Sequence, residues 1–433
     1  MPFIRKTSGV RHAPRPGLDP TRASLGNGAV VIAKQTGKTP AVTLNLAVRA
    51  GSVCDPIGMP GAAHLLARVI DRGTATRAAA EIADEIDSRG ISLTMHVTRH
   101  LFSVVSSCLV EDFDAIVALL GDILMAPTIP GPELAARKRE VITAIRQDDD
   151  NPAVRAVEQL MAMLYGEAHP YGRRAKGTVD AVERVTREQL LHLHRERFAP
   201  SDLSMVVVGD VESARVLEAA DRVFGGWRAA APPPVPLPHA PPGRGRRRVV
   251  IPMMNKAQAD IAYGFTTIPR ADPRYCAYWV MNNALGQYAI GGRLGDRIRE
   301  RQGMAYHVSS SFDANVVEGP LVIRAGVSQA NVDRAIASID EELMRLRLEG
   351  LTAREVNESR QYLIGATPRT LETNAGIANF LQTAEFFGLG LDYDLRLPGL
   401  LEAVTRDQAN AAAREAVDPE RATIVIAGPY ADR

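Results

Sequence analysis

The chain has 433 residues, enough for two or three domains with sizeable hydrophobic cores. Hydrophobic residues make up 46% of it and charged residues 23%, and these values exclude a wholly disordered protein. The formal net charge is +1, from 51 basic and 50 acidic side chains, so we expect no overall attraction to nucleic acid or to an anionic membrane.

Cysteine usage and hydropathy narrow the class of protein further. Cys54, Cys108 and Cys276 are too few and too widely spaced to predict a disulfide framework or a cysteine metal site. No run of about 18 apolar residues could span a bilayer. Residues 1–20 are basic and contain prolines, without the apolar core of a signal peptide. We expect no membrane span, and a cytoplasmic location or, if a signal has been removed, a periplasmic one.

In the first half, strand and helix patterns follow one another. Runs rich in β-branched residues predict strands over 29–33, 41–48, 92–97, 102–110 and 203–208. Apolar residues spaced three and four apart predict helices over 62–70, 78–88, 111–125, 132–147, 154–165 and 187–197.

A segment rich in proline and arginine then divides the chain almost in half. Residues 229–247 contain seven prolines, which cannot continue a helix or a central strand. We interpret Arg244 and Arg246–Arg248 as part of a solvated, flexible hinge rather than a binding patch. The predicted lobes are therefore residues 20–228 and 248–430.

The second half repeats the mixture of elements found in the first. Strands are predicted over 248–251, 258–265, 305–312, 321–327 and 422–426. Helices are predicted over 274–285, 294–301, 331–348, 353–364, 375–387 and 406–416. The pair Gly291-Gly292 is expected to form the turn before one of these helices.

Three features at the end of each half indicate an internal duplication. Val185-Thr-Arg-Glu-Gln189 returns as Val404-Thr-Arg-Asp-Gln408, Pro200 as Pro419, and the strand ending at Gly209 as one ending at Gly428, always 219 residues later. We predict an α+β protein of two homologous lobes. Each lobe has an antiparallel-rich sheet covered by helices, and together they form a clam-shell around a cleft suited to a peptide or a small ligand.

Residues 61–74 read Gly-Ala-Ala-His-Leu-Leu-Ala-Arg-Val-Ile-Asp-Arg-Gly-Thr. They resemble the active-site helix of the insulinase/pitrilysin family of metallopeptidases, whose G-x-A-H-x-x-E-H pattern binds zinc through two histidines and activates water through the glutamate. His64 matches the first ligand, but Ala67 replaces the glutamate and Arg68 the second histidine. Alanine cannot accept a proton and arginine is a permanent cation that repels zinc, so we expect no catalysis at this helix.

The family's third zinc ligand is a glutamate on a later helix, and the resemblance places Val154 at that position. Glu158, one turn further, is the one candidate for a rebuilt metal site, but with His64 alone opposite it the site would lack ligands. We expect no metal in this chain. His169, in a segment similar to the family's H-P-x-G loop, supports the fold and indicates no catalytic role.

The most specific match lies in residues 291–309, which resemble the family element R-L-x-x-x-[IL]-R-E-x-x-G-[LM]-A-Y-x-V. The resemblance implies that Arg299 and Tyr306 hold the substrate backbone and stabilise charge on its carbonyl oxygen. A guanidinium and a phenol can both donate hydrogen bonds to an oxyanion. The alternative is an ordinary surface ion pair at Arg299 and the start of a strand at Tyr306.

The chain is thus similar to the Arg/Tyr-bearing half of heterodimeric bacterial members of the family and to alpha-type subunits of mitochondrial processing peptidase. The resemblance implies a catalytically incompetent subunit that shares a chamber with a zinc-bearing homologous subunit, with peptide as substrate and zinc in the partner. A homodimer stays possible. The alternative is a non-enzymatic peptide-binding or scaffold protein, for which the edge strand predicted before Leu101 could extend a bound peptide by strand addition.

Overall fold

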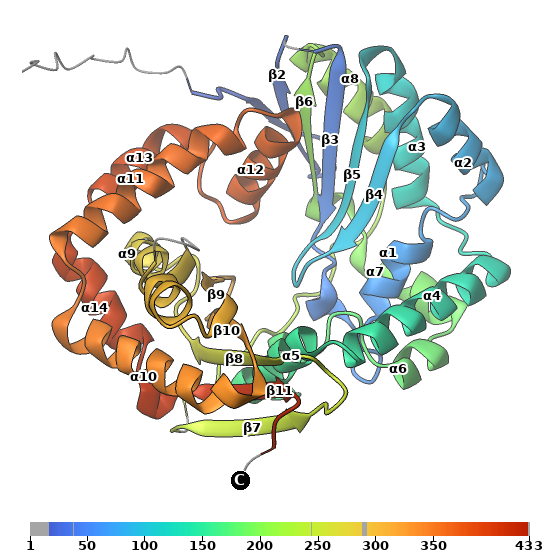
Figure 1. Cartoon of the computed structure of the whole chain (residues 1–433). Coiled ribbons are helices and arrows are strands. Elements are labelled where there is room, and N and C mark those ends of the chain that lie inside the picture. Colours follow the sequence, from blue (N-terminus) through green and yellow to red (C-terminus); the bar gives the residue numbers. More distant parts are fainter. Residues whose placement is uncertain (1–16, 38, 244, 288–291, 432–433) are drawn as a thin grey trace, which may run out of the picture.

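A computed structural model describes residues 17–37, 39–243, 245–287 and 292–431 of the chain (Figure 1). Arg244 and Gly291 lie outside the described residues. Among the helices in these ranges, none is both long and apolar enough to cross a membrane.

The first lobe contains a six-stranded sheet and eight described α-helices. In sheet order the strands are β1 (Thr21–Ser24), β2 (Val30–Gln35), β6 (Leu203–Gly209), β3 (Ala41–Val48), β5 (Phe102–Leu109) and β4 (Ser92–Val97). The helices are α1 (Ala62–Val69), α2 (Ala79–Ser88), α3 (Phe113–Met125), α4 (Gly131–Asp149), α5 (Pro152–Tyr165), α6 (Val179–Arg184), α7 (Arg187–Arg197) and α8 (Ser213–Phe224).

The second lobe contains a five-stranded sheet. In sheet order its strands are β7 (Arg247–Pro252), β11 (Thr423–Gly428), β8 (Ala259–Thr266), β10 (Pro320–Val327) and β9 (Ala305–Phe312). Its helices are α9 (Tyr275–Asn282), two π-helical segments η5 (Asn283–Gln287) and η6 (Gly295–Arg301), α10 (Val332–Glu349), α11 (Ala353–Thr370), α12 (Asn374–Phe386), α13 (Tyr393–Glu402) and α14 (Arg406–Ala416).

The two sheets have the same topology. Apart from the additional edge strand β1 of the first sheet, the order and direction of the strands agree: β6 lies between β2 and β3 as β11 lies between β7 and β8, parallel to the first of these neighbours and antiparallel to the second. The remaining neighbours are antiparallel. The expected α+β fold of two similar lobes is therefore confirmed.

The residues that revealed the duplication have the same structural role in both lobes. Thr186 and Thr405 each begin a helix with a capping box, in which the threonine oxygen accepts from the backbone N–H of a glutamine three residues later. Gly209 and Gly428 end the last strands with φ of 157° and 139°. Only glycine adopts this backbone readily, which explains why both positions kept it.

Each sheet is covered by a helix from the other lobe. Helix α5 of the first lobe packs on β8 and β11, and α12 of the second lobe packs on β3 and β6 (Figure 1). Leu160 of α5 and Leu381 of α12 are completely buried in these contacts. The exchange ties the lobes together, because neither sheet can leave its covering helix without opening a hydrophobic core.

The linker makes contacts with both its neighbouring core and the second lobe. Residues 229–243 and 245–246 contain no helix or strand, but Val235 and Leu237 pack against the core around α5. Arg246 forms an ion pair with Asp340 at 2.7 Å, and Arg248 donates a hydrogen bond to the hydroxyl of Tyr430 at 2.6 Å. These contacts stabilise one position of the segment, and the hinge interpretation stays a prediction.

Candidate functional site

Helix α1, which carries His64, Ala67 and Arg68, begins at a tightly packed turn. Gly61 has φ of 90°, and a Cβ there would lie 2.3 Å from the carbonyl oxygen of Lys176, so only glycine fits. The buried Asp55 carboxylate accepts hydrogen bonds from the backbone N–H groups of Gly61 and Ala63, both at 2.7 Å. Burial raises the pKa of Asp55 to about 7, and the two N–H donors oppose that shift.

The three motif positions of α1 have very different surroundings. His64 is half-buried, and its pKa falls to about 4 because of burial and the nearby cations of Lys176 and Arg68. Ala67 is buried in the core of the first lobe. Arg68 is exposed and lies 3.7 Å from Glu140 of α4 in a loose ion pair. A neutral histidine is thus left between positive charges.

The third position does not complete a metal site either. Val154, in the first turn of α5, has no ligand atom in its side chain. Glu158 lies 2.7 Å from the guanidinium of Arg174 and 3.5 Å from that of Arg155, so it is already paired with cations. Within the described ranges, no three His, Cys, Asp or Glu side chains gather as metal ligands would. The expectation that this chain holds no metal stays a prediction.

The ion pairs at the end of α4 were not predicted from the sequence. Lys176 binds Asp148 at 2.6 Å, Arg174 binds Asp149 at 2.8 Å, and Lys256 of the second lobe binds Asp150 at 2.6 Å. The signal was the acidic run from Asp148 to Asp150, which closes α4 beside a basic loop. These pairs supply cations close to the positions where relatives of this pattern place zinc ligands.

Arg299 and Tyr306, in contrast, are presented to solvent. Arg299 lies on η6, and its guanidinium makes a long ion pair with the adjacent Glu300, at 3.5 Å. Tyr306 is the second residue of β9, an edge strand, and is 87% exposed. Neither side chain is engaged in packing a core, so both can contact a ligand.

A β-bulge directs Tyr306 outward. His307 lies opposite Gly326 and Ala305 lies opposite Val327, which leaves Tyr306 as an extra residue without a partner on β10. A bulge bends the strand and re-aims the extra side chain. No sequence pattern signalled this irregularity.

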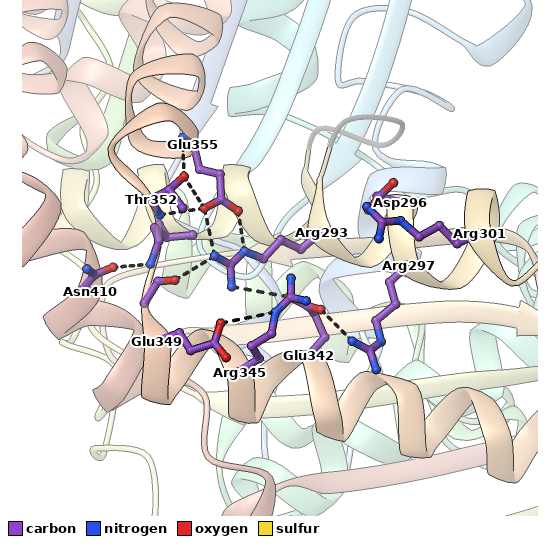
Figure 2. A network of polar contacts seen from close by, with 12 residues as sticks. Arg293, Asp296, Arg297, Arg301, Glu342, Arg345, Glu349, Thr352, Glu355 and Asn410 are labelled. Carbon is purple, nitrogen blue, oxygen red and sulfur yellow. Dashed lines mark hydrogen bonds and ion pairs between the residues drawn. The ribbon is translucent and has the colours of Figure 1, made fainter.

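Figure 2 shows what holds the segment that carries Arg299. Arg293, just before η6, makes two hydrogen bonds to the carboxylate of Glu355 on α11, at 2.5 and 2.9 Å, and a third to the carbonyl oxygen of Gly350 at 2.8 Å. Such a planar, two-point contact fixes orientation as well as distance. The start of η6 is therefore tied to α11.

A second contact in Figure 2 ties η6 to α10. The Glu342 carboxylate, whose side chain is 1% exposed, has Arg345 at 3.2 Å and Arg293 and Arg297 at 3.5 Å. Burial raises the pKa of Glu342, and the three guanidinium groups oppose that shift. Because Arg297 faces α10, Arg299 two residues later projects from another side of the segment.

Strand β4, which we expect to pair with a bound peptide, lies at the edge of its sheet, as strand addition requires. β4 is the edge of the first sheet and pairs with β5 on one side. Thr94 and His96 are exposed on one face of it. The backbone edge of β4 that faces away from β5 is open to a further strand.

This is the fold of a two-lobed, metallopeptidase-like protein. Residues 30–176 match the family described as insulinase (peptidase family M16), and residues 184–363 match the peptidase M16 inactive domain. Together the two matches cover most of the chain, so it belongs to peptidase family M16, the insulinase family.

Relatives that align with nearly the whole chain are described as uncharacterized zinc proteases. One from Mycobacterium leprae is 26% identical over 421 residues, which is 95% of this chain and 92% of that protein. One from Streptomyces coelicolor is 25% identical over 417 residues, 95% of this chain and 90% of that protein.

Solved structures share the fold of this chain. A peptidase M16 inactive domain from Pseudomonas fluorescens aligns with a TM-score of 0.88 at 24% identity, over 96% of this chain and 99% of that one. A protease from Helicobacter pylori gives 0.87 at 17% identity, over 96% and 100%. The periplasmic protease PqqL from Escherichia coli gives 0.79 at 18% identity, over 95% of this chain but 45% of PqqL.

Proposed function

We propose that this chain is the zinc-free subunit of a shared metallopeptidase. It presents Arg299 and Tyr306 to a chamber formed with a zinc-bearing homologous subunit, and the substrate is a peptide. The observation that carries the proposal is the contrast between two sites. Positions 67, 68 and 154 are Ala, Arg and Val, whereas Arg299 and Tyr306 are exposed, and the segment that carries Arg299 is held by the ion pair of Arg293 with Glu355.

The chemistry divides naturally between two such subunits. Zinc on the partner would activate the water that attacks the peptide carbonyl. Arg299 and Tyr306 would donate hydrogen bonds to the carbonyl oxygen, on which negative charge develops. The alignment with PqqL supports the division, because this chain corresponds to 45% of that protein, which leaves room for a second unit of similar size.

The test is cleavage of a long quenched-fluorescent peptide in the presence of zinc. This chain alone, a homologous H-x-x-E-H-bearing subunit alone, and their mixture are compared. We expect rapid cleavage only in the mixture. Cleavage by this chain alone that a chelator stops would instead show a rebuilt metal site, and no cleavage in any sample would favour a peptide-binding or scaffold protein.

The role of the Arg/Tyr pair is tested in the same mixture. We expect Arg299→Ala to lower kcat about 100-fold or more, as the loss of an oxyanion donor does, and to leave assembly of the two subunits unchanged. Arg334→Ala is the matched control, since Arg334 is an exposed arginine on α10 away from η6. Unchanged turnover with Arg299→Ala would rule out the assigned role.

A further inference from the structure

The second sheet carries a group of polar side chains beside Tyr306 that the Arg/Tyr pair does not explain. Asp260, Gly326 and His307 lie directly opposite one another on β8, β10 and β9. Directly opposite residues share a face of the sheet. Gly264, four residues from Asp260 on β8, faces Leu160 of α5. The group therefore lies on the face of the second sheet that α5 covers, four residues along β8 from the contact with Leu160.

Gly326 allows the imidazole of His307 to lie across β10. A Cβ at position 326 would be 2.5 Å from Cε1 and 2.9 Å from Nδ1 of His307. The ring's Nε2 is 3.9 Å from Oδ1 of Asp260, and Gln258 donates to the other carboxylate oxygen at 3.3 Å. Asp260 is buried, whereas the His307 side chain is 45% exposed. The Nε2 side of the ring is thus directed toward the buried Asp260, while the rest of the ring faces solvent.

Arg324 lies beside this imidazole on the same face. It is two residues before Gly326 on β10 and opposite Ser309 of β9. Its side chain is exposed, and it forms no ion pair with any residue that the structure describes. His307 and Arg324 are diagonal neighbours, whose Cα atoms are about 7–8 Å apart in such a ladder. Gly326 and Ser309 occupy the other diagonal, so little side-chain volume separates His307 from Arg324.

We infer that His307 and Arg324 form a subsite for an acidic side chain of the bound peptide, next to the residue held by Arg299 and Tyr306. The inference rests on the proposed function for its ligand class. The guanidinium of Arg324 and a ring N–H of His307 can both donate to one carboxylate, and charge-assisted bonds of this kind are the strong ones. A lysine or arginine of the peptide would be repelled by the same guanidinium, so the subsite discriminates between charges.

The experiment measures peptide binding to this chain alone by fluorescence anisotropy, so that no partner is required. Labelled peptides carry glutamate or glutamine at one position, scanned along the sequence. We expect the glutamate peptide to bind about tenfold more tightly at one position. The double variant His307→Gln with Arg324→Gln should bring the two affinities within about twofold and leave the glutamine peptide unchanged. Arg334→Gln, on α10, should keep the full preference.

A third variant tests how the imidazole is held. In Gly326→Ala the new methyl group would lie 2.5 Å from Cε1 of His307 and 3.0 Å from Nε2 of Gln258, so the ring is displaced and the glutamate preference should fall several-fold. Equal affinity of the unaltered chain for both peptides at every position, or no binding, overturns the inference. So does a preference that persists in the double variant. A chain that prefers glutamate but supports no cleavage in the mixture would refute the proposed function and leave the subsite standing.

Discussion

By the resemblance to the family, Arg68 takes the place of a histidine and Val154 takes the place of a glutamate. Changing both residues to those of the family tests whether the surrounding residues can still form a zinc site. His64 is suited to be a ligand, since its pKa of about 4 keeps it neutral at pH 7. With Arg68→His and Val154→Glu the chain would have three ligands on α1 and α5. We expect about one equivalent of zinc in the purified double variant, measured by mass spectrometry of the metal.

Each single variant provides the control for that experiment. Two ligands bind zinc too weakly to survive dialysis, so Arg68→His alone and Val154→Glu alone should contain none above background. The unaltered chain should contain none either. One equivalent in the unaltered chain would mean that ligands outside the family positions hold the ion.

His100 predicts a pH dependence of stability. It is buried beside the hydroxyl of Tyr171, 2.6 Å from Nε2, and burial lowers its pKa to about 4. Between this value and the unfolded value of about 6.5 the unfolded chain binds more protons, so stability falls as pH falls through that window. We expect a loss of about 2 kcal/mol from His100 between pH 7 and pH 5, measured by urea unfolding.

A substitution separates this contribution from that of other histidines. His64, whose pKa is also about 4, acts in the same direction. His100→Gln removes one titrating group, so the difference in stability between pH 7 and pH 5 should shrink by about 2 kcal/mol. An unaltered slope would mean that His100 is not buried in its neutral form.

At the scale of elements, the sequence predicted most strands and helices because their apolar periodicity is clear. β3, β4 and β9 have the predicted bounds. β1 was missed because four mostly exposed residues at a sheet edge show no alternation, and α13 because Pro398 interrupts its pattern. The helix α8 was also missed, although its apolar spacing was readable.

What the sequence could not predict is which sheet a helix covers. The apolar stripe of α5 shows that the helix is buried on one side, but the same stripe would suit either lobe. The bulge at Tyr306 and the ion pairs of Lys176 with Asp148 likewise depend on residues brought together only by the fold. Motif positions such as His64 and Arg299 could be recognised in the sequence, whereas the residues that surround them in the fold could not be predicted from it.

The exchanged helix gives a prediction of its own. Leu160 belongs to the first lobe but is fully buried against the second sheet, where it contacts Gly264. Leu160→Ala should lower the free energy of unfolding by about 3 kcal/mol, through lost burial and the cavity left behind. Leu348→Ala, at a leucine that is 76% exposed, should change it by less than about 0.5 kcal/mol. Urea unfolding followed by circular dichroism measures both.

For the whole molecule, the exchange of α5 and α12 implies that the lobes unfold as one unit. Additional contacts join them, including the ion pairs Arg22–Glu385 at 2.8 Å and Arg99–Asp313 at 2.6 Å. A lobe that unfolded alone would expose the other lobe's sheet by removing its covering helix. We therefore expect the lobes of one chain to stay together rather than to open as a hinge.

The chain contains two tryptophans, and they report on the two lobes separately. Trp227 packs against the core of the first lobe and Trp279 against that of the second. In Trp279→Phe and Trp227→Phe variants, the remaining tryptophan should show the same urea midpoint, because the transition is shared. Adding Leu160→Ala should shift both midpoints equally, although the residue lies against one sheet. Two separate midpoints would show that the lobes unfold independently, and a hinge within one chain would then again be possible.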